Sequence, residues 1–211
     1  FISATYARKF GSLSVGVSPT LAIQMFNAQG LKILSPYSSN MFNFTDMAYD
    51  WSVGGGLRVG FEWRATNELR FGLAGATPMF MSRFQKYRGL IADQGSFDIP
   101  ANLTAGVAYD VLPNLTLMAD WRHIFYSATT AGYSSYPIWF GSFGASGGAG
   151  FDWRDTDSAS LGAEWRASPK LTLRAGYHYS TIPIRDRAAT LAALAPAVAA
   201  HSVDGGFGYQ L

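Results

Sequence analysis

The segment Leu57-Arg58-Val59-Gly60-Phe61-Glu62-Trp63 decides the fold class of this chain, because apolar residues alternate in it with small or charged ones. After a short polar stretch at 65–67, the alternation resumes in Leu69-Arg70-Phe71-Gly72-Leu73-Ala74. Successive side chains of a β-strand point to opposite faces of the sheet, so a period of two residues indicates a strand. The sequence therefore predicts two antiparallel strands joined by a tight turn.

The same alternation recurs along most of the chain. A second hairpin is predicted over 103–122 and a third over 159–179, each with a proline in its turn. A leading pair of strands over 2–17 and a final strand over 203–211 follow the same rule. Together these patterns predict about nine antiparallel strands. The stretch 188–200 has a helical composition, and we expect a short helix in an outer loop there.

The predicted connections alternate between tight turns and long loops. The tight turns are expected near 9–12, 65–67, 111–114 and 167–170, and the long loops over roughly 28–48, 84–96, 128–156 and 182–200. Outer-membrane barrels have short turns on the periplasmic side and long loops outside. The alternation favours such a barrel over a soluble β-sandwich, whose strands also carry one polar and one apolar face.

The composition disfavours several classes of protein. Charged residues make up 14% and aromatic residues 15% of the 211 residues, which is unlike a disordered chain. The net charge of +2 comes from scattered Lys and Arg without a basic stripe, so nucleic-acid binding is disfavoured. The chain contains no Cys, which excludes a thiolate metal site and a cysteine nucleophile.

The way in which this chain could cross a membrane follows from its strands. No run of about eighteen strongly apolar residues occurs, so a transmembrane helix is not expected. Several predicted strands reach about ten residues, which is enough to cross a bilayer when a strand is tilted. Backbone groups in lipid must be paired within the protein, which requires closure of the sheet. We therefore expect an all-β fold, an antiparallel transmembrane β-barrel that forms a single domain over 1–211.

Several segments of the chain resemble one known family. They are Met81–Tyr87, Gly89–Pro100, Gly150–Asp155, the hairpin Trp165–Tyr179, and the following Ile182-Pro183-Ile184. In these segments the chain resembles the FadL family of long-chain fatty acid outer-membrane transporters, and the order of elements is kept over most of the chain.

The resemblance implies a monomeric barrel of about fourteen strands in the bacterial outer membrane, plugged by an N-terminal hatch, of which this chain supplies about nine. On this interpretation the hatch, the first strands and their gating residues are missing at the N-terminus. The barrel also continues past Leu211, unless that residue is a natural C-terminus. The implied function is passive uptake of long-chain fatty acids or other hydrophobic compounds, captured by outer loops and passed into the lumen. The sequence leaves open whether the cargo is a fatty acid or an aromatic hydrocarbon.

Two of the predicted outer loops carry large apolar side chains suited to capturing a hydrophobic ligand. The candidates are Phe26, Leu31, Ile33, Phe42 and Phe44 in the first loop, and Phe84, Tyr87 and Leu90 in the second. The resemblance implies that these two loops frame the initial binding groove, and exposed apolar patches usually mark binding sites. The alternative for each residue is that it packs the loops against each other.

A carboxylate head group would need a cation in the lumen, and a guanidinium offers a bidentate fork for it. The candidates are Arg58, Arg70, Lys86, Arg122 and Arg174. The alternative is a luminal charge network in which these cations pair with Glu62, Asp120 and Glu164.

No catalytic residue, metal site or cofactor is expected. His123, His178 and His201 are dispersed, and none lies in a nucleophile motif. The Gly-rich run 141–150 lacks the Lys-Ser/Thr end of a phosphate loop, and we expect a flexible outer loop there. The expected partners are a hydrophobic small molecule and outer-membrane lipid. Two alternatives remain, a structural or adhesive barrel and a barrel hydrolase that uses His178.

Overall fold

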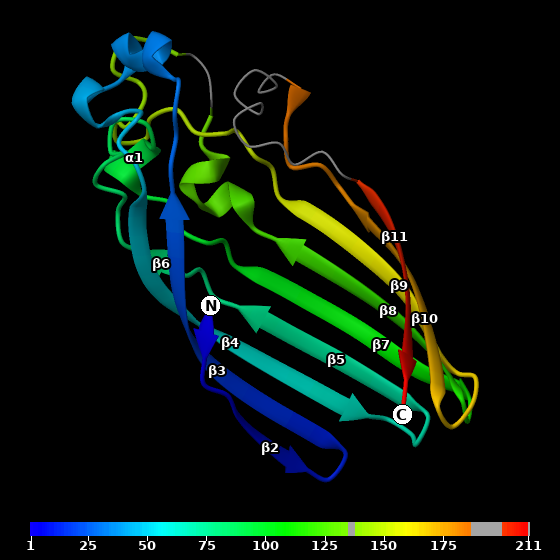
Figure 1. Cartoon of the computed structure of the whole chain (residues 1–211). Helices are drawn as coiled ribbons and strands as arrows, with labels where there is room; N and C mark the ends of the chain where they lie inside the picture. Colours follow the sequence, from blue (N-terminus) through cyan, green and yellow to red (C-terminus); the bar gives the residue numbers. More distant parts are fainter. Residues whose placement is uncertain (135–137, 187–199, 211) are drawn as a thin grey trace.

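The computed structural model describes residues 1–134, 138–186 and 200–210 (Figure 1). In these residues eleven strands form one sheet, and every pair of neighbours is antiparallel. The strands are β1 (Ile2–Ser3), β2 (Tyr6–Phe10), β3 (Leu13–Phe26), β4 (Asp50–Arg64), β5 (Leu69–Ala76), β6 (Phe80–Met81), β7 (Asn102–Leu112), β8 (Leu115–Ile124), β9 (Thr156–Arg166), β10 (Leu171–Ser180) and β11 (His201–Tyr209). The prediction of an all-β antiparallel fold is confirmed.

The eleven strands occupy nine positions in the sheet. The order is β1-β3-β4-β5-β7-β8-β9-β10-β11, while β2 also pairs with β3 and β6 also pairs with β4. Since β1 and β2 follow each other along β3, and β5 and β6 follow each other along β4, each couple fills one position. Among the described residues, no pairing joins β11 to β1 or β2. The sheet described here is therefore a strongly curved wall with two open edges (Figure 1).

The register places the alternating residues on two distinct faces. On β4, Val59, Phe61 and Trp63 lie opposite Val17, Val15 and Leu13 of β3. These side chains belong to a continuous apolar face that remains well exposed, with Phe61 at 46% and Leu161 of β9 at 60%. Such a face suits lipid, because lipid tails offer no competing hydrogen bonds and cover apolar surface well.

The opposite face of the sheet is polar. Glu62 of β4, Asp120 of β8 and His178 of β10 lie in one row across the wall, and most of the residues between them are glycine or serine. Alternation of apolar and polar residues is typical of strands whose outer side meets lipid and whose inner side meets a lumen. We refer to these sides as the apolar face and the polar face.

The tight turns and the long loops lie at opposite ends of the sheet (Figure 1). Near the tight turns, Trp63 and Phe71 stack with ring centroids 5.7 Å apart, and Tyr109 and Trp165 lie at the same level. Tyr6 instead lies opposite Val17 in the body of the sheet. An aromatic girdle therefore borders the apolar face at its turn end, as expected for a membrane interface.

Three long loops carry the short helical segments of the structure. Loop 27–49 contains 3-10 turns at Lys32–Tyr37 and Met41–Asn43, loop 82–101 contains α1 (Ala92–Gly95), and loop 125–155 contains 3-10 turns at Tyr126–Ala128 and Thr130–Gly132. No helix in the described part of the chain is both long and apolar enough to span a membrane. The helix expected within 188–200 falls almost entirely outside the described residues.

A β-bulge interrupts the wall between β5 and β6. Ala76 pairs with Arg58 and Phe80 pairs with Gly55, so three residues oppose two on β4. The extra residue reverses which side chains face inward, because side chains alternate along a strand. As a result Met79 turns inward and packs against Ala22, at 2% and 0% exposure respectively.

The well-buried part of the molecule lies at the loop end of the sheet. One cluster joins Phe44 to Phe143, and a second joins Phe84, Tyr87 and Ile91. The sheet itself contributes few buried side chains, since its apolar face is exposed. Packing of loops 27–49, 82–101 and 125–155 therefore forms the core that positions the candidate site.

Candidate functional site

A cavity of about 540 Å³ lies among the three long loops, at the end of the wall opposite the tight turns. Its walls come from the end of β3 with the start of loop 27–49, from 90–97 of the second loop, and from Thr130 and 143–153 of the third. The volume falls within the range of about 300–1,000 Å³ typical of small-molecule sites. No single loop could form this enclosure alone.

The lining of the cavity is aromatic. Five rings from the described residues contribute, those of Phe26, Phe97, Phe143, Phe151 and Trp153. Phe97 and Phe151 meet edge to face with centroids 6.2 Å apart, and Phe151 and Trp153 lie 5.4 Å apart at 31°. Rings offset or tilted in this way expose both faces and edges, which favours further aromatic contact.

The remaining lining is aliphatic or neutral. Leu31, Leu90, Ile91 and several alanines complete the apolar surface, and the polar contribution comes from Asn27, Gln29 and Thr130. The Thr130 hydroxyl is already used, because it donates to the Ser96 carbonyl at 2.7 Å. Among the residues that the structure describes, no Asp, Glu, Lys, Arg or His lines the cavity. The site therefore offers apolar contact and no counter-ion.

Buried groups behind the lining hold it in place. The Tyr87 hydroxyl accepts a hydrogen bond from the Ala28 N–H at 3.1 Å and lies 2.9 Å from Asn27 Oδ1 and 2.7 Å from the Ala48 carbonyl. On another wall Tyr126 packs edge to face on Trp153, with centroids 5.1 Å apart, and burial raises the pKa of its phenol. These tyrosines act as supports of the wall rather than as ligands.

The Gly-rich run at 141–150 is part of the site. A β-carbon at Gly144 would collide with the Arg88 carbonyl, and one at Gly150 with the Thr130 carbonyl. Glycine is therefore required for the close approach of this loop to its neighbours. Within this run the backbone packs closely at Gly144, Gly148 and Gly150, and Ala149 and Gly150 line the cavity.

The structure divides the predicted capture residues into three groups. Phe26, which ends β3, and Leu31 and Leu90 line the cavity. Ile33 and Phe42 lie on the outer surface, each 85% exposed. The others are buried in the loop core, Phe44 and Tyr87 at 0% and Phe84 at 1%. For those three, the packing alternative describes their position.

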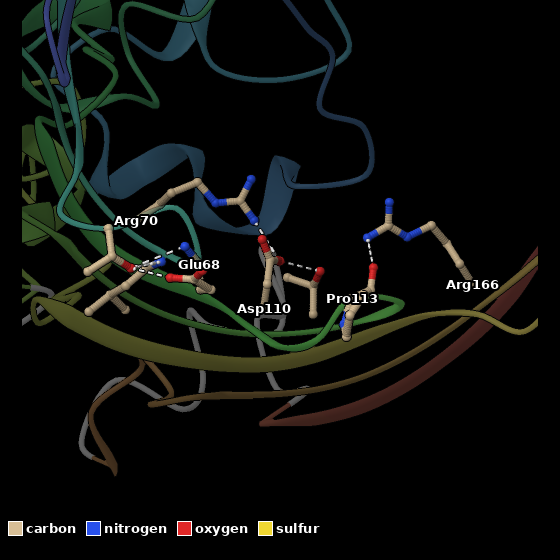
Figure 2. A network of polar contacts seen from close by, with 8 residues as sticks. Glu68, Arg70, Asp110, Pro113 and Arg166 are labelled. Atoms are coloured by element: carbon tan, nitrogen blue, oxygen red, sulfur yellow. Dashed lines mark hydrogen bonds and ion pairs between the residues drawn. The ribbon is translucent and has the colours of Figure 1, made fainter.

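Two of the predicted head-group residues lie in ion pairs on the polar face. Arg174 Nε lies 2.7 Å from Glu164 Oε2, as the charge-network alternative expected. Arg70 Nη2 donates to Asp110 Oδ1 at 3.1 Å, and Thr116 donates to the same oxygen at 2.6 Å (Figure 2). The pairing with Asp110 follows from the register, which sets Arg70 opposite Ala108, two residues from Asp110 on the same face.

The same network extends along the turn end of the wall. Arg166 donates to the Pro113 carbonyl at 3.0 Å, and Thr66 donates to Glu68 at 2.9 Å (Figure 2). The Arg166 contact fastens one tight turn to the adjacent strand β9, and the Thr66–Glu68 contact stabilises another turn internally. They lie at the end of the sheet that is remote from the cavity.

The other three predicted cations also lie away from the cavity lining. The Arg58 guanidinium lies over the Phe1 ring at 5.5 Å, and Arg122 donates to the Thr104 hydroxyl at 3.2 Å. Lys86 donates to the Tyr49 carbonyl at 2.7 Å. The structure therefore does not bring the five cations together with the aromatic cavity.

The histidines form contacts of their own. His178 Nδ1 lies 3.0 Å from the Ser160 hydroxyl on the polar face, but no carboxylate contacts His178 in the described part of the chain. A serine hydrolase needs a third group to orient the histidine and donors for an oxyanion. No set of three potential metal ligands gathers in the residues that the structure describes.

Sequence patterns did not reveal most of the lining. Phe97, Phe143, Phe151 and Trp153 lie in loops without periodicity, so nothing in the alternation marks them. Three of the segments that carry the family resemblance do converge, however. Phe97 of one meets Phe151 of another, and Arg154 donates to the Ile182 carbonyl of a third at 2.9 Å. The family resemblance of these segments was therefore the only feature of the sequence that pointed to this part of the lining.

Comparison with solved structures shows the same architecture in other proteins. The Ralstonia pickettii toluene transporter TbuX matches over 99% of this chain and 57% of its own, with a TM-score of 0.61 and 18% identity. The Pseudomonas putida toluene transporter TodX matches over 98% of this chain and 59% of its own, with a TM-score of 0.62 and 14% identity. A Pseudomonas aeruginosa FadL homologue matches over 87% of this chain and 49% of its own, with a TM-score of 0.55 and 15% identity. The chain thus spans less than two thirds of these proteins. No curated protein sequence matches it.

The family assignment rests on the sequence. The profile of the family described as outer membrane protein transport protein (OMPP1/FadL/TodX) matches residues 10–211, which is nearly the whole chain. The apolar and polar faces of the wall and the arrangement of turns and loops agree with that assignment. This chain therefore belongs to the OMPP1/FadL/TodX family of outer-membrane transport proteins.

Proposed function

We propose that the protein passively carries hydrophobic compounds across the outer membrane and that its cargo is neutral and aromatic. The observation that supports this proposal is the 540 Å³ cavity, whose described lining has five aromatic rings and no charged side chain. The protein acts on its cargo by binding alone and catalyses no reaction. Two of the structurally similar proteins, TbuX and TodX, are toluene transporters, which agrees with this class of cargo.

The energetics of burial favour a neutral cargo. Each square ångström of apolar surface removed from water stabilises the bound state by about 25 cal/mol, and ring–ring contacts add about 0.5–1.5 kcal/mol. A carboxylate placed in the same surroundings loses its hydration at a cost of several kcal/mol unless a cation or several donors replace it. None of the five predicted cations lines the cavity, so a long-chain fatty acid fits it less well than a hydrocarbon.

Capture begins on the outer surface in this proposal. Ile33 and Phe42 are each 85% exposed, and Phe140 is 76% exposed while its ring stacks on Tyr37. Large apolar side chains left in water at the rim of a site usually mark binding. Cargo would adsorb there and move to Phe26 and Leu31, which belong to the same part of the chain and line the cavity.

The cavity needs residues from one chain only, so a monomer suffices for binding. The apolar face of the wall contacts outer-membrane lipid in this arrangement. The polar face lines the route from the cavity towards the tight turns. Its ion pairs, such as Arg174–Glu164, keep the wall rigid and do not hold the cargo.

The experiment is an uptake assay with the intact protein in vesicles. Radiolabelled toluene should enter faster than into empty vesicles, with saturation, and ethylbenzene should compete. Replacing Leu90 with Trp, which fills the cavity, should reduce both binding and uptake at least several-fold. Phe71→Ala, on the apolar face and outside the lining, is the control. Uptake equal to that of empty vesicles would contradict the proposal.

A further inference from the structure

The turn that borders the cavity in loop 82–101 has an unusual backbone. Asp93 and Gln94 are adjacent and both left-handed, with φ of 50° and 57°. Residues other than glycine adopt this conformation rarely, because the β-carbon approaches the backbone, although Asp tolerates it better than most. Two such residues in succession persist only where surrounding contacts hold them.

Besides the backbone hydrogen bonds within loop 82–101, four hydrogen bonds from another loop hold this turn. The Asp93 carboxylate accepts a hydrogen bond from the Gly147 N–H at 2.7 Å through Oδ1 and from the Tyr133 hydroxyl at 2.9 Å through Oδ2. The Asp93 N–H donates to the Ala145 carbonyl and the Gln94 N–H to the Gly144 carbonyl, both at 2.9 Å. Asp93 thus contributes three of the hydrogen bonds that join loop 82–101 to loop 125–155.

The hydrogen bonds of Asp93 lie where two walls of the cavity meet. Ile91 and Ala92, immediately before Asp93, line the cavity, and so do Ala149 and Gly150, shortly after Gly147. Gly144 approaches the Arg88 carbonyl so closely that a β-carbon would collide with it. If the Asp93 contacts break, three of the hydrogen bonds that fix the two walls against each other are lost, and the left-handed turn loses part of its support.

We propose that Asp93 is a positioning residue, whose carboxylate clamps the two loops together and thereby sets how long cargo stays in the cavity. This inference rests on the proposed function, since it assigns Asp93 a role in retaining the same cargo. Asp93 does not itself line the cavity. It acts through the residues on either side of the clamp, and opening of the clamp releases cargo.

The test compares Asp93→Gly and Asp93→Asn with the wild type. Glycine accepts a positive φ without strain, so Asp93→Gly removes the carboxylate while keeping the turn. Asparagine keeps one acceptor oxygen and also tolerates the left-handed region. The matched control is Asp46→Gly, because Asp46 has a φ of 59° and its carboxylate accepts from Gly30 within its own loop.

The first readout is the dissociation rate of naphthalene from the intact protein, measured by stopped-flow fluorescence. Dissociation should be roughly ten-fold faster or more in Asp93→Gly, because two hydrogen bonds to a charged acceptor are lost and each is worth about a factor of ten. Asp93→Asn should lie between it and the wild type, and Asp46→Gly should match the wild type. An unchanged rate in Asp93→Gly, or an equal effect of Asp46→Gly, would overturn the proposal.

The second readout is hydrogen–deuterium exchange, which needs no cargo. Peptides covering 90–97 and 143–153 should exchange faster together in Asp93→Gly, while peptides of β7 stay protected. An increase confined to 90–97 would overturn the clamp, since a purely local role would disturb that turn alone. If the wild type fails to bind naphthalene, the proposed function fails, and the exchange data still decide whether Asp93 couples the loops.

Discussion

The rings of Phe97 and Phe151 meet edge to face across two different loops, with centroids 6.2 Å apart and planes at 80°. Phe97 precedes β7 and Phe151 precedes β9, so strands that are not neighbours deliver the two halves of one aromatic surface. The site therefore depends on how the loops pack on the wall. Its chemistry cannot be assigned to one segment.

The first prediction concerns these two rings. Phe151→Ala should weaken binding of a neutral aromatic compound by about 1–3 kcal/mol, because it removes apolar surface and ring contacts. Phe97→Ala should act similarly, and the double variant should lose less than the sum of the two, because the rings contact each other. Calorimetric titration with toluene measures all three losses. Full additivity would mean that the rings do not act as one surface.

The second prediction concerns a required glycine. Gly150→Val should reduce cargo binding at least several-fold while the strands remain folded, because a β-carbon there collides with the Thr130 carbonyl. Gly205→Ala of β11 is the control, since no atom lies within 4 Å of the position of its added β-carbon. Binding titrations and circular dichroism separate the two effects. Normal binding by Gly150→Val would show that this loop does not shape the cavity.

The third prediction concerns the two faces of the wall. Leu161→Arg should destabilise the protein in bilayers by about 2–4 kcal/mol, because it places a charge at mid-depth on the lipid side. Ser160→Arg, the preceding residue, points to the polar face and should cost much less. Unfolding by urea in lipid vesicles gives both values. Equal losses would contradict the assignment of the faces.

The fourth prediction concerns pH. The hydrogen bond to Asp93 raises the pKa of the Tyr133 phenol above 10.0, with smaller contributions from burial and from the Asp93 charge. Because the folded state then holds the proton more tightly than the unfolded state, this contribution to stability is complete below pH 10 and is lost as the pH rises through the folded pKa. Ultraviolet titration should show Tyr126 and Tyr133 titrating late, and only the pKa of Tyr133 should return towards 10 in Asp93→Gly. No change in that variant would contradict the contact.

Local sequence patterns predicted the wall well. The alternation from Leu57 to Ala74 predicts the two strands, the turn between them and the face on which each side chain lies. A shift of one residue would move every side chain to the opposite face of the sheet. The tight turns were predicted from short polar stretches, as at 65–67. The pattern fails at Thr77–Met79, where a bulge adds one residue and turns Met79 inward. A bulge of this kind cannot be recognised from the period of the hydrophobic pattern in the sequence.

The site was predicted only in part. Phe26, Leu31 and Leu90 line the cavity, whereas Phe44 and Tyr87 are buried behind it. Composition alone cannot separate these groups, because both are apolar and lie in the same loops. The part of the Gly-rich run in the cavity wall was not predicted for a similar reason, since glycine serves close packing as well as flexibility. The Arg70–Asp110 pair depends on register between strands, which a single strand pattern does not give.

The most direct test of the account compares toluene with benzoate, which differ mainly in replacing a methyl group by a carboxylate. Both are titrated into the intact protein at neutral pH under identical conditions. The account predicts saturable toluene binding and benzoate binding that is about a hundred-fold weaker or absent, since an uncompensated carboxylate costs about 3 kcal/mol or more in an apolar cavity. Benzoate binding as tight as that of toluene would contradict the claim that this site selects neutral aromatic cargo.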